Sequence, residues 1–286
     1  MSLLLCCLIL SPYAFANDAD PALQSLMNFK ESRVTVKYAP AEEERLKVLK
    51  IKANSIGLQS GAFYAANKIR TRLEGLSNTL DNIFDFGRLG VVRNYKGAYI
   101  VNPIVSEVEK SIMLSPDSRS FVIRDQIFLI AKDPYLSLSI PSWRSYIEFQ
   151  VEPVRIPDDM IPPNTEEEIQ VWKRELLIGY QMGINQVEDI FVTRFARLSR
   201  DIIGMQRYEL LRQRNMVSDI KIADAYYPVS GGGNRMNINE SRVSIEINPA
   251  LNSNRWDWET IPRLADVSDL FPNGSELRNW VTLDVK

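Results

Sequence analysis

The sequence predicts an α+β protein in which long helices dominate and a small antiparallel β part packs beside them. Two observations predict this class. Apolar residues recur in steps of three and four over 41–86 and again over 164–215, which is the period of one helix face. Over 120–132 and 220–248, runs rich in β-branched and aromatic residues replace that period, and such runs indicate strands joined in hairpins.

The first helical stretch, 41–86, carries signals for its start and for its packing. Three glutamates at 42–44 fall in its first turn, where negative charge is favourable beside the positive end of the helix dipole. Gly57 and Gly61 lie four residues apart on one face. This spacing predicts close packing against another element, and a kink is the alternative.

The second helical stretch, 164–215, is about fifty residues long and would span about 75 Å as one helix. Thr165 and Glu168 form a capping box, which satisfies backbone N–H groups at a helix start. The acidic run 166–168 is therefore expected to serve capping and the helix dipole, and not catalysis. The positions at which this helix could be interrupted are Gly179, Gly183 and Gly204.

The β part is expected in two places. Within 120–132, two apolar runs surround a polar centre, which predicts a hairpin, with one bent strand as the alternative. The stretch 220–248 predicts a hairpin or a three-stranded meander, with the glycines 231–233 at a turn. No Lys-Ser/Thr follows these glycines, so they do not form a phosphate-binding loop. The segment 87–116 is less regular and is expected to hold a strand or an extended connection.

The start of the chain has the pattern of an export signal. An apolar run is followed by Ala14-Phe15-Ala16, which predicts a signal peptide over 1–16 that is cut after Ala16. The next residues, 17–40, are polar and irregular and are expected to form an exposed N-terminal arm or an edge strand. A single α+β domain is expected over 41–258, followed by a C-terminal tail over 259–286. The predicted location is the periplasm.

The composition restricts the chemistry that the chain can perform. It contains no histidine, and its two cysteines, Cys6 and Cys7, both lie in the apolar leader. A processed chain would lack Ser-His-Asp triads, cysteine nucleophiles and the usual zinc and copper ligands. We therefore expect a protein that is not an enzyme, with no catalytic residue, cofactor or metal site. The net charge of -2 gives no electrostatic reason to expect nucleic-acid binding.

Arginines collect towards the end of the second helical stretch. Asp201 follows Arg197 by four residues and Glu209 precedes Arg212 by three, so ion pairs on the helix surface are available. Three interpretations stay open: a self-paired solvated face, a surface for an acidic partner, or nucleic-acid contact. The last is least favoured, because no aromatic residues are interleaved for base stacking. The arginines concerned are Arg194, Arg197, Arg200, Arg207, Arg212 and Arg214.

Trp256 and Trp258 lie two residues apart in a stretch that reads as a loop. If the backbone is extended there, both side chains point the same way. They could then anchor a neighbouring subunit. Packing on the core of the chain itself is the alternative.

Several short motifs, in a fixed order, resemble one protein family. They are Ser55-x-Gly57-x-Gln59-x-Gly61, Trp143-Arg144-x-Tyr146, Trp172 with Gly179, Gly183 and Gln186, Arg197-Leu198-x-Arg200-Asp201-x-x-Gly204-Met205-x-x-Tyr208, and Met216-Val217-Ser218. Together they resemble the DotC family, called TraI in some conjugative plasmids, over residues 45–258. The family consists of outer-membrane-associated components of type IVB secretion and conjugation machines.

The resemblance implies a non-enzymatic scaffold in a ring-shaped outer-membrane core complex. Its implied partners are DotD-like proteins, DotH-like proteins and further copies of the chain itself. Members of the family are usually lipidated at a mature N-terminal cysteine. This sequence departs from that pattern, because its predicted mature start is Asn17. Attachment to the outer membrane through partners could replace direct anchoring.

The resemblance also indicates which residues belong to motifs or interfaces. The alternative function is an exported hydrolase that acts on cell-wall glycan through two carboxylates facing one cleft, although no spacing in the sequence marks such a pair. The candidate motif or interface residues are Trp143, Arg144, Tyr146, Arg197, Arg200, Asp201, Gly204, Tyr208, Trp256 and Trp258.

Overall fold

The computed structural model describes residues 20–29, 42–148, 150–156, 160 and 162–259. The predicted signal peptide over 1–16, the part of the predicted arm over 30–40 and the tail from 260 onward lie outside these residues. Within them the α+β class is confirmed. The helices are α2 (Pro21–Met27), α3 (Glu42–Gly75), α4 (Ser77–Ile83), α5 (Trp143–Ile147), α6 (Glu166–Gln213) and the 3-10 turn η1 (Arg255–Asp257).

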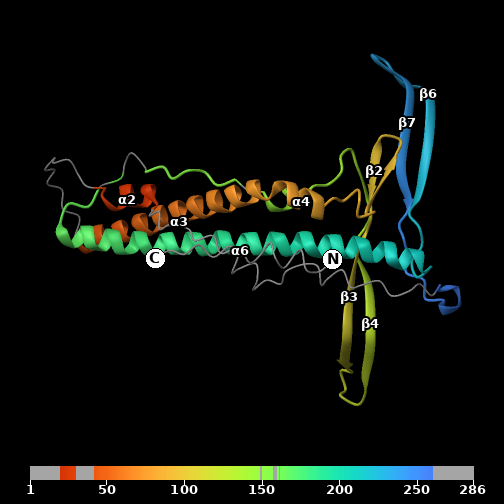
Figure 1. The fold of residues 1–286 in the computed structure, drawn as a ribbon, viewed down its shortest axis with the longest axis horizontal. Helices are drawn as coiled ribbons and strands as arrows, with labels where there is room; N and C mark the ends of the chain where they lie inside the picture. The colour runs from red at the N-terminus through yellow and green to blue at the C-terminus, as the bar shows by residue number, and fades with distance from the viewer. Residues whose placement is uncertain (1–19, 30–41, 149, 157–159, 161, 260–286) are drawn as a thin grey trace. The chain divides into compact units, whose positions relative to one another are not determined.

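The strands form three antiparallel sheets. One sheet has the order β1 (Val92–Tyr95), β2 (Ala98–Val101), β5 (Tyr135–Ser137). The other two are two-stranded: β3 (Ile104–Leu114) with β4 (Phe121–Lys132), and β6 (Lys221–Gly232) with β7 (Arg235–Ile247). Figure 1 shows both of these as long hairpins.

The chain divides into two compact units, each described by itself below. Unit 1 takes its residues from Met1–Leu80 and Tyr146–Ala196, and unit 2 from Asp81–Ser145 and Arg197–Phe271, as far as the structure describes them. The single domain expected over 41–258 stays a prediction.

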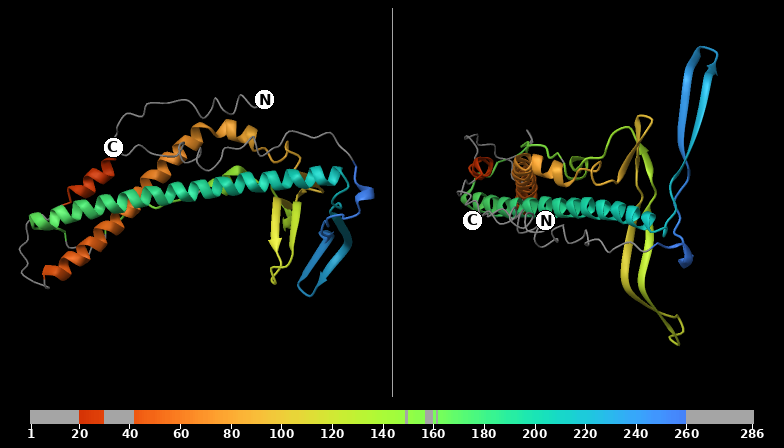
Figure 2. Two further views of the ribbon diagram at one scale, coloured as in Figure 1. Left: turned by 90° about the horizontal axis from the view of Figure 1, so that it is seen from below. Right: turned by 45° about the vertical axis from the view of Figure 1, so that its right-hand side comes forward.

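Unit 1 is built on α3 and the first part of α6, and Figure 2 shows α3 crossing α6 obliquely. The apolar stripes that predict the two helices are the buried faces. On α3 they include Ala53, Ile56 and Ile69, and on α6 Trp172, Leu176, Ile184 and Phe191. Burying each of these large side chains contributes about 1.5–3 kcal/mol.

The N-terminal arm is one point at which the sequence-based expectation is wrong in its described part. Residues 21–27 form α2 and not an irregular arm or an edge strand. Asp20 caps the helix, its Oδ1 accepting the backbone N–H of Ala22 at 3.1 Å, and Pro21 suits the first helical position. Leu26 is buried against Leu49 and Trp172. Two helical turns are too short for the apolar period to be recognised, so tertiary packing decides this segment.

The two predicted helical stretches are confirmed. The stretch 41–86 becomes α3 and α4, which are separated at Leu76, and 164–215 becomes α6. None of the glycines in α6 interrupts it. In the part of the chain that the structure describes, no helix is both long and apolar enough to cross a membrane.

The predicted hairpin over 120–132 is wrong, and the one-strand alternative is correct. Residues 121–132 form the single strand β4, whose partner is β3. The turn lies earlier, at 115–120, where the backbone N–H of Ser115 donates to the carbonyl oxygen of Ser120 at 2.8 Å. The polar centre at 124–126 can remain within a strand because all three of its residues are exposed.

The region 87–116 is more regular than expected, since it contains β1, β2 and β3. The hairpin over 220–248 is confirmed, with two strands and not three. Two of its glycines have a positive φ, which glycine adopts most easily: Gly231 near the end of β6, at 104°, and Gly233 in the turn, at 63°.

Candidate functional site

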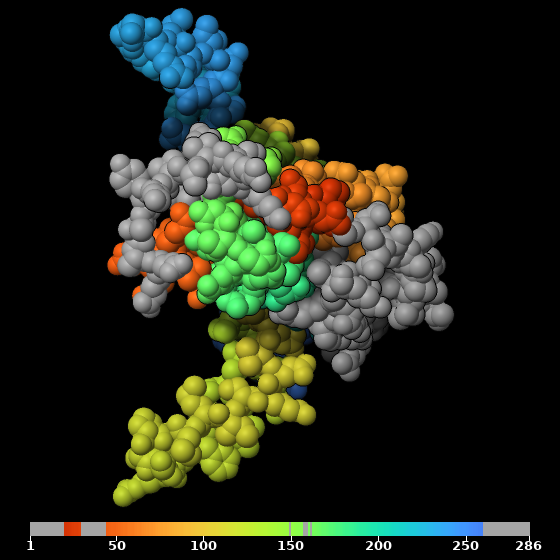
Figure 3. All heavy atoms as spheres, turned by 90° about the vertical axis from the view of Figure 1, so that its left-hand side faces the viewer, coloured from red at the N-terminus to blue at the C-terminus, as the bar shows by residue number. Residues whose placement is uncertain are grey.

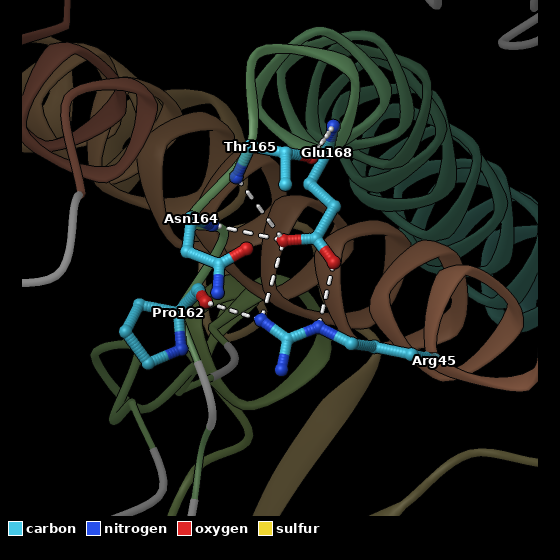
Figure 4. Close-up of polar contacts among 5 residues, drawn as sticks. All are labelled: Arg45, Pro162, Asn164, Thr165 and Glu168. Carbon is cyan, nitrogen blue, oxygen red and sulfur yellow. Dashed lines mark hydrogen bonds and ion pairs between the residues drawn. The ribbon is translucent and has the colours of Figure 1, made fainter. Parts of the chain in front are cut away.

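The best-defined polar cluster in unit 1 surrounds Glu168 at the start of α6 (Figure 4). The capping box is confirmed: the Glu168 N–H donates to Thr165 Oγ1 at 3.2 Å, and Glu168 Oε2 accepts the Asn164 N–H at 2.9 Å. Arg45 of α3 adds two bonds, from Nε to Oε1 at 2.6 Å and from Nη2 to Oε2 at 3.2 Å. One side chain therefore caps α6 and fastens it to α3.

The Glu168 carboxylate is kept charged although it is only 4% exposed. Burial raises its pKa, but the hydrogen bonds from Arg45 and from the backbone of Asn164 and Thr165 outweigh burial and hold the pKa below its ordinary value. A buried, ionised carboxylate is tolerated because it is hydrogen-bonded and paired with a positive charge. Removal of that partner, here Arg45, would leave an unpaired buried charge and destabilise the fold. This cluster is consequently a structural clasp between α3 and the start of α6.

Four glycines set the distance between α3 and α6 in unit 1. A Cβ atom on Gly57 would lie 2.2 Å from the carbonyl oxygen of Leu176, and one on Gly183 would lie 2.1 Å from that of Leu58. Gly61 and Gly179 are equally crowded, at 2.0 and 2.1 Å from backbone oxygens of the other helix. Two pairs of small residues spaced by four bring the two backbones into contact, which confirms the close-packing interpretation of Gly57 and Gly61 and explains why they belong to a motif.

Two aromatic side chains of α6 hold α2. Trp172 Nε1 donates to the carbonyl oxygen of Leu26 at 3.0 Å, and the Tyr180 hydroxyl donates to Asp20 Oδ2 at 3.0 Å. Burial, together with the nearby Asp20 carboxylate, raises the pKa of Tyr180, so this hydroxyl stays protonated. An open hollow of about 350 Å³ next to this contact is lined by Asp20, Phe63, Tyr64, Asn67, Lys68 and Arg72, among others.

The Trp-Arg-x-Tyr motif gathers around one acid in unit 2. Trp143 Nε1 donates to Asp81 Oδ1 at 2.7 Å, and Arg144 contacts both Asp81 oxygens, at 2.5 and 3.0 Å. The guanidinium of Arg144 also lies over the Trp143 ring, 4.4 Å from its centroid. Trp143 is buried, so these contacts fasten the start of α5 to the last turn of α4. Tyr146, half-buried, belongs to unit 1.

The motif that contains Asp201 has residues on both the buried and the exposed face of α6. Asp201 is 1% exposed, and its Oδ1 accepts both bonds of Arg200, at 3.1 and 2.8 Å. The neighbouring Arg200 therefore takes the place of Arg197 as its partner. Arg197 is exposed, and its side chain has no hydrogen bond or ion pair with any described residue.

Gly204 and Tyr208 are packing residues on the same helix. A Cβ atom on Gly204 would lie 2.5 Å from Ile104 Cγ2, so this glycine allows the start of β3 to lie against α6. Tyr208 is fully buried, and its hydroxyl donates to the carbonyl oxygen of Ser218 at 3.2 Å. Arg207 joins the same contact, 3.0 Å from Glu107 of β3.

Most of the arginine-rich face is self-paired. Arg212 bonds to Glu209 at 2.5 and 3.1 Å and to Asp219 at 3.2 Å, which confirms the predicted i,i+3 pair. Arg194 donates to the carbonyl oxygen of Glu148 at 2.8 Å. With Arg200 and Arg207 also engaged, Arg197 is the exposed arginine of this face that best suits an external partner.

The two C-terminal tryptophans differ, and the condition under which their side chains would point the same way, an extended backbone, is not met between them. Residues 255–257 form η1, capped by Asn254, whose Oδ1 accepts the Trp256 N–H at 3.3 Å. Trp256 is 95% exposed, whereas Trp258 is 38% exposed and donates Nε1–H to the Asn252 carbonyl oxygen at 2.9 Å. Trp256 is therefore the more exposed of the two and the one whose side chain makes the fewer contacts with the chain itself.

Sequence reasoning missed several residues that matter here. Arg45 and Asp81 carry no signal, because a single charged residue on a helix is usually solvated. The exposed apolar surface of the hairpins was missed because β3 was not recognised. Among the residues described, no group of three or more acidic side chains is placed to hold a metal ion, and the expectation of no metal stays a prediction.

Comparison with known proteins gives one family. The model of a family described as "Type IV secretory system, conjugal DNA-protein transfer" matches residues 43–260. No curated protein matches the chain. The matched range contains the α3–α6 crossing, the Glu168 cluster, the Asp81 cluster and η1.

Proposed function

Since this chain belongs to the TraI family of type IV secretory systems for conjugal DNA-protein transfer, we propose that it is a non-enzymatic structural subunit of the outer-membrane core complex of such a machine. In this role it is exported to the periplasm and holds DotD-like and DotH-like subunits in place. It reaches the outer membrane through these partners.

One observation carries the structural role: the motif residues described below are engaged in packing contacts within the chain. Gly57 and Gly183 let two helices touch, Trp143 and Arg144 close on Asp81, and Tyr208 is buried in unit 2. A catalytic motif would instead be expected to place polar groups around an open cleft. Together with the absence of histidine and the predicted loss of both cysteines with the leader, this supports a scaffold.

The exposed surface supports a protein that works beside neighbours. Large apolar side chains are exposed along both long hairpins, including Ile112, Phe121, Val229 and Ile238. Exposed apolar surface of this kind usually marks contacts with other proteins. Direct nucleic-acid binding is not part of the proposal, because Arg200, Arg207 and Arg212 are paired with carboxylates of the chain itself.

The experiment is a complementation test of Arg197→Glu in cells that lack the gene for this chain. Arg197 has no partner among the described residues, so its reversal should leave the fold and export unchanged. We expect transfer to fall about tenfold or more, since a like charge at an interface disfavours the docked state. Lys50→Glu, an equal change at an exposed position of α3 outside the motifs, is the control and should transfer normally. Normal transfer by Arg197→Glu, with export verified by cell fractionation, would contradict the interface role.

A further inference from the structure

The β3–β4 hairpin of unit 2 has a long outer part that the rest of the described chain leaves uncovered. Its first residues are held by α6, through Arg207 and Gly204. Beyond them the hairpin is exposed, with Ile112 at 71% and Phe121 at 62%. On the face drawn in Figure 3, no other described segment of unit 2 covers this outer part, which is coloured yellow.

One face of the hairpin is mainly apolar. Side chains alternate between the faces of a strand, so residues directly opposite in the register share a face. The opposed pairs on one face are Val108–Ile127, Ile112–Ile123 and Leu114–Phe121. The other face carries the polar pairs Glu109–Gln126 and Ser111–Arg124 beside the apolar pair Met113–Val122. On the first face, Asp125 falls between Ile123 and Ile127.

Both edges of the hairpin are open. Within the described residues, β3 and β4 form a sheet of two strands, so the outer N–H and C=O groups of each strand have no strand partner. Such edges are templates for pairing with another chain. A two-stranded ribbon is also marginal by itself and gains stability from a third strand.

Four charges near the middle of the hairpin have no partner. They are Glu109 and Lys110 on β3 and Arg124 and Asp125 on β4. No described residue forms a hydrogen bond or an ion pair with any of these side chains. Exposed charges alone would be ordinary, but here they interrupt an apolar surface on a free edge.

We propose that the hairpin binds a second copy of this chain, with β4 of one copy pairing edge to edge with β3 of the next. This inference rests on the proposed structural function. The β3 strand of a neighbour presents the same side chains that β4 already pairs with in its own hairpin. In the same register, Ile123 lies opposite Ile112 of the neighbour, Phe121 opposite its Leu114, and Arg124 opposite its Ser111.

The backbone supports the same register. In an antiparallel pair, residues whose amide groups point inward alternate with residues whose amide groups point outward. Residues opposite each other in the hairpin share this orientation. The outward groups of β4 therefore meet the outward groups of a neighbour's β3 without a shift in register.

Symmetric pairing of β4 with β4 is disfavoured by the charges. Two identical antiparallel strands related by a two-fold axis place residues of the same face opposite each other. Arg124 and Asp125 are adjacent and so lie on opposite faces. A symmetric β4-to-β4 register centred on Arg124 places the two Arg124 side chains opposite each other, and one centred on Asp125 does the same with the two Asp125 side chains. No symmetric register places Arg124 opposite Asp125. The same holds for Glu109 and Lys110 on β3, so the β4-to-β3 contact is favoured.

A lipid surface fits less well than a second copy. If the apolar part of the hairpin entered the hydrocarbon of a membrane, the four charged side chains in its middle would enter it too or lie directly against it. Transfer of an unpaired charged group from water into hydrocarbon costs much free energy. The four side chains are Glu109, Lys110, Arg124 and Asp125. In a neighbour's sheet paired in the hairpin's own register, Glu109 lies diagonal to Arg124, so these two opposite charges come within reach of each other.

The test uses two single variants of the full chain, Glu109→Arg and Arg124→Glu, studied by sedimentation over a concentration series. Each variant alone opposes like charges across the proposed contact, so we expect self-association about tenfold weaker than that of the wild-type chain. An equimolar mixture should associate like wild type, because every β4-to-β3 contact between unlike copies again joins Arg to Glu. Each variant also places two like charges near each other within its own hairpin, and mixing the variants does not remove this repulsion. Recovery of self-association in the mixture therefore reports on the contact between copies. Circular dichroism verifies that both variants are folded.

Cross-linking locates the contact. With Cys6 and Cys7 replaced by Ser, Ile112→Cys and Ile123→Cys are prepared as separate single-cysteine chains. Oxidation of the mixture should yield the disulfide-linked heterodimer in excess over either homodimer, because opposed strand residues come within disulfide reach.

A wild-type chain that stays monomeric, single variants that associate normally, or a mixture that fails to recover would each overturn the proposal. Homodimers of Ile123→Cys in excess would replace it with the symmetric contact. Binding of wild-type chain to phosphatidylglycerol vesicles without self-association would replace it with a lipid surface. If copies stay apart while the chain still binds a DotH-like subunit, the hairpin proposal alone fails. If copies pair but no such subunit binds, the proposed function fails instead.

Discussion

Gly61 of α3 and Tyr180 of α6 are in backbone contact: a Cβ atom on Gly61 would lie 2.0 Å from the Tyr180 carbonyl oxygen. Real Cβ atoms do not approach so closely, and the obstacle is backbone, which cannot rotate away. The distance between the two helices therefore depends on a missing methyl group. Tyr180 also holds α2 through Asp20, so this crossing supports most of unit 1.

Gly61→Ala should separate the two helices and destabilise unit 1 by about 3 kcal/mol, at the upper end of typical overpacking costs. The measurement is urea unfolding followed by circular dichroism at 222 nm. Gly75→Ala is the matched control, because it is the same change at the end of the same helix, where an added Cβ meets nothing within 4 Å. It should be neutral or slightly stabilising, since alanine is the better helix former. Equal midpoints for the two variants would disprove the crossing.

The Glu168 clasp makes stability depend on pH. Because the folded-state pKa of Glu168 lies below its ordinary value of 4.5, the pair contributes stability above that value and loses it as pH falls through the folded-state pKa. Glu168→Gln should therefore cost about 2 kcal/mol at pH 7 and progressively less in acid. Urea unfolding of both proteins at several pH values measures this difference. A difference that stays constant down to pH 3 would show that the charge is not involved.

Arg144 is expected to control the ionisation of Asp81. The hydrogen bonds from Arg144, followed by the one from Trp143, hold the pKa of Asp81 below its ordinary value. In Arg144→Ala that pKa should rise towards the ordinary value, while in Trp143→Phe the rise should be smaller. Carbon-detected NMR titration of the Asp81 carboxyl measures both. An unchanged pKa in Arg144→Ala would show that the two side chains do not meet.

The two C-terminal tryptophans should separate stability from binding. Trp258→Ala removes a hydrogen bond to Asn252 and part of the packing, so it should lower the thermal midpoint. Trp256→Ala removes a side chain that touches little, so the midpoint should stay within about 1 °C. If Trp256 anchors a partner, binding should fall in this variant alone. Loss of stability in Trp256→Ala would mean that the residue is packed and is not an anchor.

Local sequence signals were sufficient for the long elements of this fold. Steps of three and four predict α3 and α6, the Thr165–Glu168 spacing predicts the cap, and Gly57 with Gly61 predicts a close approach. Each of these signals lies within a few residues of the structure that it specifies.

The features that were missed depend on residues far apart in the chain. The 120–132 segment contains both apolar runs of a hairpin, but its true partner is β3, and only the turn residues near Asp117 could have indicated this. Arg45 reaches Glu168 across 123 positions, and Asp81 reaches Arg144 across 63. The identity of the motif residues was accessible from the sequence, whereas their roles as packing residues became clear only from the contacts.

The most direct test of the scaffold role is sedimentation of the processed chain with purified DotH-like and DotD-like subunits from the same transfer system. We expect the chain to move from its own sedimentation coefficient into a larger species that contains all three proteins, and Arg197→Glu to reduce that species. A chain that sediments unchanged in the presence of both subunits would contradict the account.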